Sequence, residues 1–405
     1  MKLYYFNFEN GKGTVIFDKT PKRGFSTAEF RQRTAKAQVQ MAKAGCAGLL
    51  LTSEHDVRYF TGFHTSFWQS PTRPWFVFVP SNGKPIAVIP EIGAELMRRS
   101  WLDDIRTWSA PSPKDDGITI LKELLLPLSR KCARIGVPKG HETSLRMPLG
   151  DWECLLAALP GLKIYDATDI VQGLRMIKSA AEIEKLGHIC RIGSKVFSEM
   201  PHIIHEGMPL EEVFRQFRLT AIGLGADDAP YVVGAADHQG YSNVISPPSR
   251  RPLQVGDVLM VDSGSTWDGY FCDFDRNWAI GHASDKARRA YDVLWRATEA
   301  GIAAAKPGNT CRDLFLAMSS IIAEMDDCGA DIGRLGHGLG MQLTEQPSHA
   351  AFNETELKEN MVLTIEPSLS YGDGLMMVHE ENIVLGSTNA ELLTARADLE
   401  LPVVV

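Results

Sequence analysis

Three acidic residues that could together bind a cation lie close in sequence in the second half of the chain. An apolar run at residues 258–261 leads into Asp262, and Asp273 and Asp275 follow a short second run. Between them stands Asp268-Gly269, the strongest short signal for a hairpin turn. With that turn, Asp275 lies opposite Asp262, and the three acids share one face of the hairpin. Carboxylates packed this closely repel one another unless a cation lies among them.

More residues of the kinds that bind metals follow further along the chain. His337 stands between two glycines, Glu366 ends an apolar run before a proline, and Glu380 and Glu381 interrupt another apolar run. A lone histidine in such a frame is more often a satisfied buried residue, and a lone buried acid is more often part of a salt bridge. Several acids together with one histidine favour a metal site instead.

These motifs resemble the pita-bread superfamily of aminopeptidase P, prolidase, methionine aminopeptidase and creatinase. The resemblance covers the whole chain, because the N-terminal half resembles the N-domain of creatinase and prolidase. It implies five metal ligands, which are Asp262, Asp273, His337, Glu366 and Glu381. It also implies two divalent ions, Mn, Zn, Fe or Co, about 3.5–4 Å apart, with a shared water that attacks a carbonyl-type carbon. The position of Glu366 implies a further role as proton acceptor.

The histidines that peptidases of this superfamily carry around their metals are missing at the matching positions. Those positions hold Ile245 or Tyr241, depending on the direction of counting, then Gly333 and Thr344. Glu345 does match the family, and we expect Tyr241 and Glu345 to contact the substrate. His238 and His379 are the candidates for supplying a proton in their place, with a structural role as the equal alternative for each.

Other positions resemble creatinase. Asp275 and Glu380 match places where creatinase binds its substrate with glutamate, and the segment containing Phe67, Trp68 and Arg73 resembles one that reaches the partner subunit's site. The resemblance implies that Arg73 binds a substrate carboxylate, that Phe67 and Trp68 contact the substrate, and that Asp275 and Glu380 face a cationic nitrogen. A surface loop with core aromatics is the alternative for this segment.

The elements that must position these residues are predicted by apolar periodicity and capping patterns. Ser26 should begin a helix that runs to Ala44 and ends at Gly45, and Ser179 with Glu182 should open a long amphipathic helix. Short apolar runs predict strands at residues 47–52, 75–79, 85–89, 134–137 and 162–165, with a strand-rich stretch at 361–385. We therefore expect an α/β N-terminal domain at residues 1–170, followed by an α+β pita-bread catalytic domain at residues 171–405.

Composition narrows the class of protein. A chain of 405 residues is too long for one core, and its net charge of −8 argues against a nucleic-acid partner. No apolar stretch reaches the ~18–20 residues of a membrane span, and the first residues do not form a signal peptide. Seven scattered cysteines are typical of unpaired thiols in a reducing compartment. We therefore expect a cytoplasmic protein without a membrane partner.

Together, the motifs favour a dinuclear metal-dependent hydrolase that cleaves a C–N bond of the amide or peptide type. An enzyme like Xaa-Pro dipeptidase or aminopeptidase P is the leading hypothesis. The alternative is a non-peptide hydrolase or lyase for a small zwitterion, as in creatinase, ectoine hydrolase and some dimethylsulfoniopropionate lyases. A metal-free binding module, as in histone chaperones of this fold, is disfavoured by the complete ligand set. The resemblance also implies a homodimer in which each N-domain contributes to the neighbouring active site.

Overall fold

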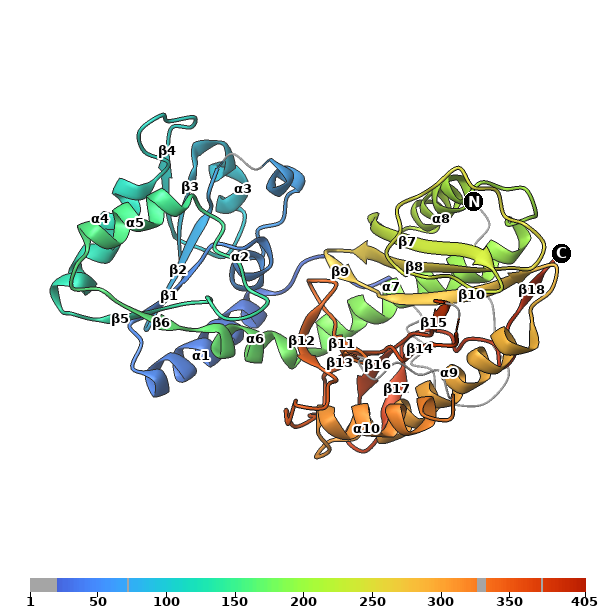
Figure 1. Cartoon of the computed structure of the whole chain (residues 1–405). Coiled ribbons are helices and arrows are strands. Elements are labelled where there is room, and N and C mark those ends of the chain that lie inside the picture. The colour runs from blue at the N-terminus through green and yellow to red at the C-terminus, as the bar shows by residue number, and fades with distance from the viewer. Residues whose placement is uncertain (1–19, 71–72, 326–332, 373) are drawn as a thin grey trace. The chain divides into compact units, whose positions relative to one another are not determined.

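A computed structural model describes residues 20–70, 73–325, 333–372 and 374–405 of the protein. Contacts divide the described chain between Met176 and Ile177, and each of the two units is considered by itself (Figure 1). The predicted boundary after residue 170 falls inside helix α6 (Thr168–Met176), which packs against α1 (Thr27–Ala44) of the first unit. Among the described residues, no helix combines the length and the apolar character that crossing a membrane requires.

The first unit is an α/β domain around a six-stranded mixed sheet in the order β4-β3-β2-β1-β5-β6. Its strands are β1 (Gly48–Leu51), β2 (Phe76–Pro80), β3 (Ile86–Pro90), β4 (Asp104–Trp108), β5 (Arg134–Val137) and β6 (Lys163–Asp166). Its other helices are α2 (Glu54–Thr61), α3 (Ala94–Arg98), α4 (Ile118–Arg130) and α5 (Leu149–Ala158). Apolar side chains of the sheet pack against α4 and α5 and form the core of this unit.

Local patterns predicted most of this unit correctly. The Ser26 side chain accepts a hydrogen bond from the backbone N–H of Glu29 at the start of α1, and Gly45 ends α1 in the left-handed conformation, with φ of 64°. The five predicted strands are confirmed within two residues at each end as β1, β2, β3, β5 and β6. Strand β4 was not predicted, because its polar residues give it no continuous apolar run.

The second unit contains two sheets and several covering helices. Its helices are α7 (Ala180–Glu199), α8 (Leu210–Gly223), α9 (Asp285–Ala304) and α10 (Cys311–Ile322). The first sheet contains β7 (Asp228–His238), β8 (Asp257–Trp267), β9 (Tyr270–Phe271), β10 (Phe274–Ile280) and β18 (Val403–Val404). The second contains β11 (His337–Gly338), β12 (Glu345–Ser348), β13 (Val362–Ile365), β16 (Glu381–Leu385) and β17 (Ala390–Leu392). A short pair, β14 (Ser368–Ser370) and β15 (Met376–Val378), completes the unit.

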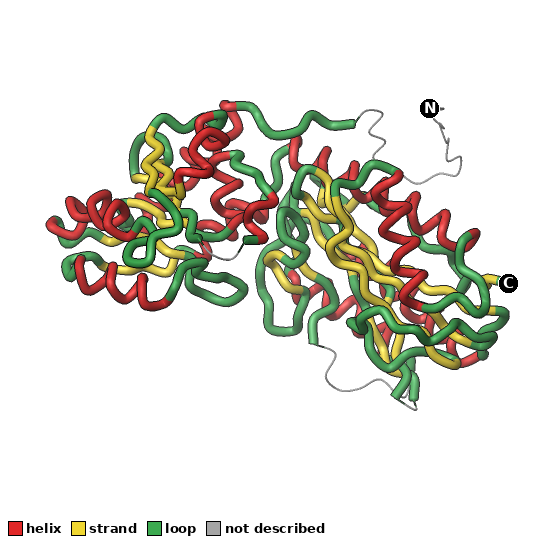
Figure 2. The backbone as a smooth tube through the Cα atoms, turned by 90° about the horizontal axis from the view of Figure 1, so that it is seen from above, coloured by secondary structure: helices red, strands yellow, loops and turns green. Residues whose placement is uncertain are grey.

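The helices of the second unit pack on its sheets. Helix α7 packs on β8, and α8 packs on β7. Helix α9 packs on β13, β14 and β15, and α10 packs against α9 (Figure 1). Figure 2 shows the long strands of the first sheet running side by side, with a helix lying along them. The predicted capping box is confirmed at the start of α7, where Ser179 and Glu182 each bind the other's backbone N–H. This arrangement is the predicted pita-bread architecture.

The predicted hairpin is confirmed between β8 and β10. Asp268 and Gly269 have φ values of 44° and 65°, which is the left-handed pair that a tight two-residue hairpin turn requires. Asp275 pairs with Asp262 in the antiparallel ladder, as the turn position predicted. The hairpin therefore presents Asp262, Asp273 and Asp275 on one face of the first sheet.

Candidate metal centre

His337 lies at the centre of a buried group of carboxylates drawn from both sheets. Possible ligand atoms of Asp273, His337 and Glu380 all lie within 4.8 Å of one another. His337 Nε2 is 3.5 Å from Asp273 Oδ2 and 3.8 Å from Glu366 Oε2. Its other nitrogen, Nδ1, is 2.9 Å from the carbonyl of Gly338, a contact that leaves Nε2 to face the acids. Three or more groups of these types within bonding reach can hold a divalent cation.

Three buried carboxylate oxygens of this region have no hydrogen-bond partner among the described residues. They are Asp262 Oδ1, Asp275 Oδ1 and Glu380 Oε1. A buried polar oxygen without a partner costs free energy, and an unpartnered charged oxygen costs more. Three such oxygens near one histidine fit the bonding requirements of metal ions. The side chains present are therefore suited to hold the divalent ions that the family resemblance implied.

The titration behaviour of these groups is consistent with a cation site. Burial raises the pKa of Asp262 to about 6 and that of Glu366 to about 7, the latter helped by repulsion from Asp262. Burial, with repulsion from the neighbouring acids, raises the pKa of Asp273 and of Glu380 well above the usual range. Burial lowers the pKa of His337 to about 4, which keeps the imidazole in the neutral form that metals bind. A cation among these acids restores their charged forms.

We predict that the metal-free protein becomes less stable between about pH 7.5 and pH 9. Carboxyls whose pKa values the fold raises well above their usual range, Asp273 and Glu380 among them, still hold protons that the unfolded chain has already lost. Stability therefore falls as the pH rises, by about 1.4 kcal/mol per pH unit for each retained proton. The window starts about one pH unit above the usual histidine pKa of about 6.5, where the buried histidines are neutral in the unfolded chain as well as in the fold. Thermal unfolding with a chelator should show the midpoint falling by about 3–6 °C per pH unit.

The control for this prediction is the same pH series with saturating Mn²⁺. Bound cations favour the charged carboxylates, so the fall in unfolding midpoint should shrink or disappear. A metal-free protein whose midpoint stays constant or rises from about pH 7.5 to pH 9 contradicts the assignment of these acids to one crowded, buried cluster.

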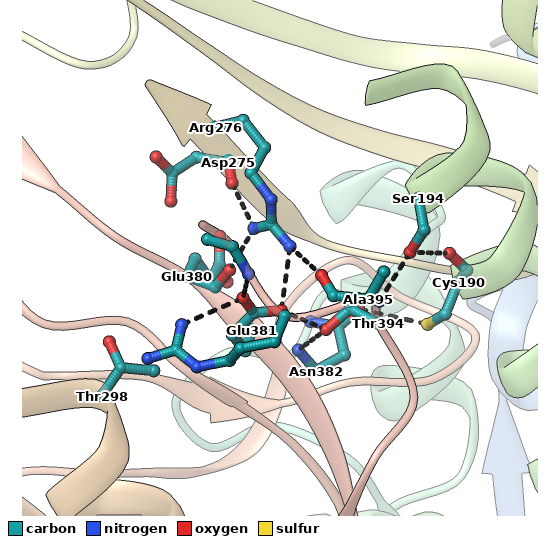
Figure 3. A network of polar contacts seen from close by, with 12 residues as sticks. Cys190, Ser194, Asp275, Arg276, Thr298, Glu380, Glu381, Asn382, Thr394 and Ala395 are labelled. Atoms are coloured by element: carbon teal, nitrogen blue, oxygen red, sulfur yellow. Dashed lines mark hydrogen bonds and ion pairs between the residues drawn. The ribbon is translucent and has the colours of Figure 1, made fainter. Parts of the chain in front are cut away.

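Glu381 does not belong to this cluster, and its predicted role as a metal ligand is wrong in this structure. Its Oε1 accepts hydrogen bonds from Arg396 at 3.2 Å and from the backbone N–H of Ala397 at 2.8 Å. Its Oε2 accepts from Arg276 at 3.0 Å and also from Thr394 (Figure 3). Both oxygens are therefore satisfied by protein donors. Glu380, predicted to meet a substrate cation, is the glutamate that lies in the group with Asp273 and His337.

Neither histidine proposed as a proton donor reaches the cluster. His379 is buried with its Nδ1 2.9 Å from the Thr298 hydroxyl and its Nε2 3.2 Å from Arg396. His238 is exposed at the end of β7, where it pairs with Asp257, five residues along β8 from Asp262. At about 3.3 Å per residue, that separation is roughly 17 Å. The structural alternative therefore holds for His379, and His238 lies too far from the acids to exchange a proton directly.

Tyr241 and Glu345, predicted to contact substrate, are both engaged within the protein. The hydroxyl of fully buried Tyr241 donates to Asn277 Oδ1 and accepts from the backbone N–H of Val378, each at 2.9 Å. Glu345 is buried, forms an ion pair of 3.1 Å with Lys178, and accepts two backbone hydrogen bonds from the loop after His337. Both residues thus bind protein groups here, and their roles as substrate contacts stay predictions.

Asp275 lies beside the cluster, in an orientation set by its neighbours. Its Oδ2 accepts a hydrogen bond of 2.7 Å from Asn277, which also donates to the carbonyl of Val378 at 2.8 Å. Its Oδ1 is one of the three unpartnered oxygens. Burial raises the pKa of Asp275 well above the usual range, with repulsion from Asp262 as the next cause. Asp275 is therefore available to a cation or a donor at the site.

The segment with Phe67, Trp68 and Arg73 belongs to the first unit. Trp68 is buried, with its ring 5.7 Å from that of Trp75, and Arg146 lies 4.8 Å from the Trp68 ring centre. Arg146 also donates to the Arg73 carbonyl at 3.1 Å. Phe67 is half-buried, and its ring meets that of Trp75 edge to face at 6.2 Å. Trp68 therefore fits the alternative of a core aromatic, while Phe67 and Arg73 keep their predicted roles as hypotheses.

Two residues beside the cluster were not predicted. Tyr231 on β7 pairs with Gly264, and burial together with the nearby charge of Asp262 raises the pKa of Tyr231. His349 is fully buried, with its Nε2 3.0 Å from the carbonyl of Thr364, and burial lowers its pKa to about 3. Tyr231 lies on the same face of β7 as the residue that pairs with Asp262. The sequence alone does not reveal this, because it depends on how β7 pairs with β8.

Comparison with known proteins agrees with this fold and with a metal-dependent enzyme. Residues 184–387 match metallopeptidase family M24, and residues 33–177 match the creatinase/prolidase N-terminal domain. The chain is 27% identical over 402 residues to the probable dipeptidase PepE of Mycobacterium bovis, covering 94% of this chain and 98% of the relative. It is 29% identical over 235 residues to the Xaa-Pro dipeptidase of Pyrococcus furiosus, covering 58% of this chain and 67% of the relative.

A solved structure shares the fold over nearly the whole chain. The dipeptidase PepE of Mycobacterium ulcerans superposes with a TM-score of 0.81 at 28% identity, covering 94% of this chain and 99% of the other. The match to the M24 family spans half of the chain and contains every residue of the carboxylate and histidine cluster. The chain belongs to metallopeptidase family M24 and is a metal-dependent hydrolase.

Proposed function

We propose that this enzyme hydrolyses the C–N bond of a dipeptide-sized substrate with two divalent ions, drawn from Mn, Zn, Fe and Co. The observation that carries this proposal is the group of buried acids around His337, of which Asp262, Asp275 and Glu380 each present an unpartnered oxygen. Oxygen-rich sites with one imidazole suit these metals. The names of the relatives, dipeptidase and Xaa-Pro dipeptidase, support a substrate of this class.

The proposed ligand set is Asp262, Asp273, His337, Glu366 and Glu380. When bound, divalent ions supply an activated water and polarise the scissile carbonyl. Glu366 is the proposed proton acceptor, because its side chain is 30% exposed whereas that of Asp273 is only 6% exposed. A proton acceptor must reach solvent or substrate.

A small zwitterion that is not a peptide is the second candidate substrate. Asp275 favours it, because its unpartnered Oδ1 offers an additional acceptor for a cationic nitrogen beside the ligand set. Arg73 would bind the carboxylate of either substrate, with Phe67 beside it. This role requires a homodimer in which the partner subunit donates its N-terminal domain. A cytoplasmic location is part of the same proposal and rests on the scattered cysteines.

The test is a substrate panel with the purified protein loaded with Mn²⁺ or Zn²⁺. We expect turnover of dipeptides, with Xaa-Pro dipeptides cleaved more slowly than by prolidases that keep the missing histidines. Lost general acid–base groups typically cost about 10²–10⁴-fold in rate. The Arg73→Ala variant, run on the same panel, should raise KM and leave metal content unchanged.

The outcomes of the panel distinguish the two candidate substrates and test whether the protein binds divalent ions. Turnover of small zwitterions without any dipeptide cleavage would replace the proposal with the second candidate. A protein that binds no divalent ion would overturn both. An Arg73→Ala variant with unchanged KM would restrict the segment around Arg73 to a packing role in the first unit.

A further inference from the structure

The main chain of Asp273 lies at a break in the hairpin. Cys272 and Asp273 stand between β9 and β10, outside both strands. The backbone N–H of Cys272 still donates to the carbonyl of Ser265 at 3.0 Å. The backbone N–H of Asp273 donates instead to Asn382 Oδ1 at 3.0 Å, and its carbonyl accepts from Asn382 Nδ2. The side-chain amide of Asn382 thus makes the hydrogen bonds to the backbone of Asp273 that a neighbouring strand would otherwise make.

Asn382 is itself held firmly on β16. It is fully buried, it pairs with Thr364 of β13, and its backbone N–H donates to the hydroxyl of Thr394 at 3.2 Å. The thiol of Cys190 on α7 donates to Asn382 Oδ1 at 3.3 Å (Figure 3). The amide has only one productive orientation, because a flipped amide would set N–H against N–H and oxygen against oxygen. Asn382 therefore specifies where the backbone of Asp273 lies.

This contact joins the two sheets at the metal centre. Asp273 directly precedes β10 of the first sheet, whereas Asn382 lies on β16 of the second sheet and Glu380 directly precedes that strand. Glu380 and Asn382 are two residues apart, on either side of Glu381, the first residue of β16. Arg276 of β10 makes a second contact between the two sheets. Its guanidinium donates to the carbonyl of Glu380 and to the carboxylate of Glu381, each at 3.0 Å. Two reciprocal contacts thus hold Asp273 against Glu380.

We propose that Asn382 is a positioning residue that holds the carboxylate of Asp273 at bonding distance from the ions bound by His337 and Glu380. The inference rests on the proposed ligand role of Asp273. Groups that orient metal ligands typically contribute about 10–100-fold to metal affinity. Asn382 touches no metal in this account, and it acts only through the backbone of Asp273.

The test compares Asn382→Leu, which keeps the shape of the side chain and removes both hydrogen bonds, with the wild-type protein. We expect Mn²⁺ affinity, measured by calorimetry, to fall about 10–100-fold. In the metal-free protein, hydrogen exchange at the Asp273 amide should become faster, because its acceptor is gone. Asn309→Leu is the matched control, since it removes a side-chain hydrogen bond of 2.8 Å to the carbonyl of Ala304 in the same unit. That control should leave both readouts unchanged.

The outcomes separate this inference from the proposed function. If wild-type protein binds no Mn²⁺, the proposed function fails. If wild type binds Mn²⁺ and Asn382→Leu binds it equally well, with unchanged exchange at Asp273, the positioning role is wrong. Should Asn382→Leu not fold, Asn382→Ser takes its place, because serine is too short to span both backbone groups of Asp273. The same losses are expected of it, and wild-type affinity in this variant would overturn the inference.

Discussion

Replacing Glu380 with glutamine is expected to weaken Mn²⁺ binding by more than about 100-fold, beyond the loss typical of an outer partner. Glu380 lies within 4.8 Å of possible ligand atoms of Asp273 and His337, and its Oε1 has no protein partner among the described residues. An amide is a far poorer ligand for these ions than a carboxylate. Calorimetry with Mn²⁺ and metal analysis after dialysis measure the effect.

The stability of the metal-free protein provides the control for Glu380→Gln. Removing one acid from a crowded group relieves repulsion, so the metal-free variant should unfold at or above the wild-type temperature. Loss of metal binding without loss of stability identifies a ligand. Wild-type affinity for Mn²⁺ in Glu380→Gln would remove Glu380 from the ligand set.

Replacing Glu381 with alanine should have the opposite profile, a large loss of stability. Glu381 is completely buried and forms ion pairs with Arg276 at 3.0 Å and Arg396 at 3.2 Å. Removing one partner of a buried ion pair costs about 3–5 kcal/mol, because the opposite charge stays buried without compensation. For a domain of this size, that corresponds to a fall of roughly 6–20 °C in unfolding midpoint. Thermal unfolding of the metal-free protein measures it.

Glu299 offers a matched control for Glu381. It also pairs with Arg396, at 2.8 Å, but its side chain is 43% exposed. Exposed ion pairs contribute about 0–1 kcal/mol, so Glu299→Ala should change the midpoint only slightly. A Glu381→Ala variant that keeps wild-type stability and loses its metal would restore Glu381 as a ligand.

The contrast between Glu380 and Glu381 shows where sequence reasoning reaches its limit. Neighbouring residues of a strand face opposite sides, so a shift of one residue exchanges a ligand for an ion-pair partner. Ile365 pairs with Glu381 between β13 and β16, which directs Glu366 and Glu380 to the other face together. Only this pairing, between segments with no short turn joining them, distinguishes the two glutamates.

Local signals predicted the other half of the centre well. The Asp268-Gly269 turn sets the register of β8 and β10, and the opposition of Asp262 and Asp275 follows from it. Tyr231 and Asn382 were missed because they reach Asp262 and Asp273 across long connections. His379 was misassigned because its side chain is turned toward Thr298 and Arg396, which its place beside Glu380 in the sequence does not reveal.

Diffraction from crystals of the Mn²⁺-loaded protein, recorded at the manganese absorption edge, tests the central claim most directly. The account predicts anomalous peaks bonded to Asp273, His337 and Glu380, with Asp262 and Glu366 completing the coordination and Glu381 still paired with Arg276 and Arg396. Manganese bonded to Glu381, or no peak among these acids in protein that binds Mn²⁺ in solution, would contradict it.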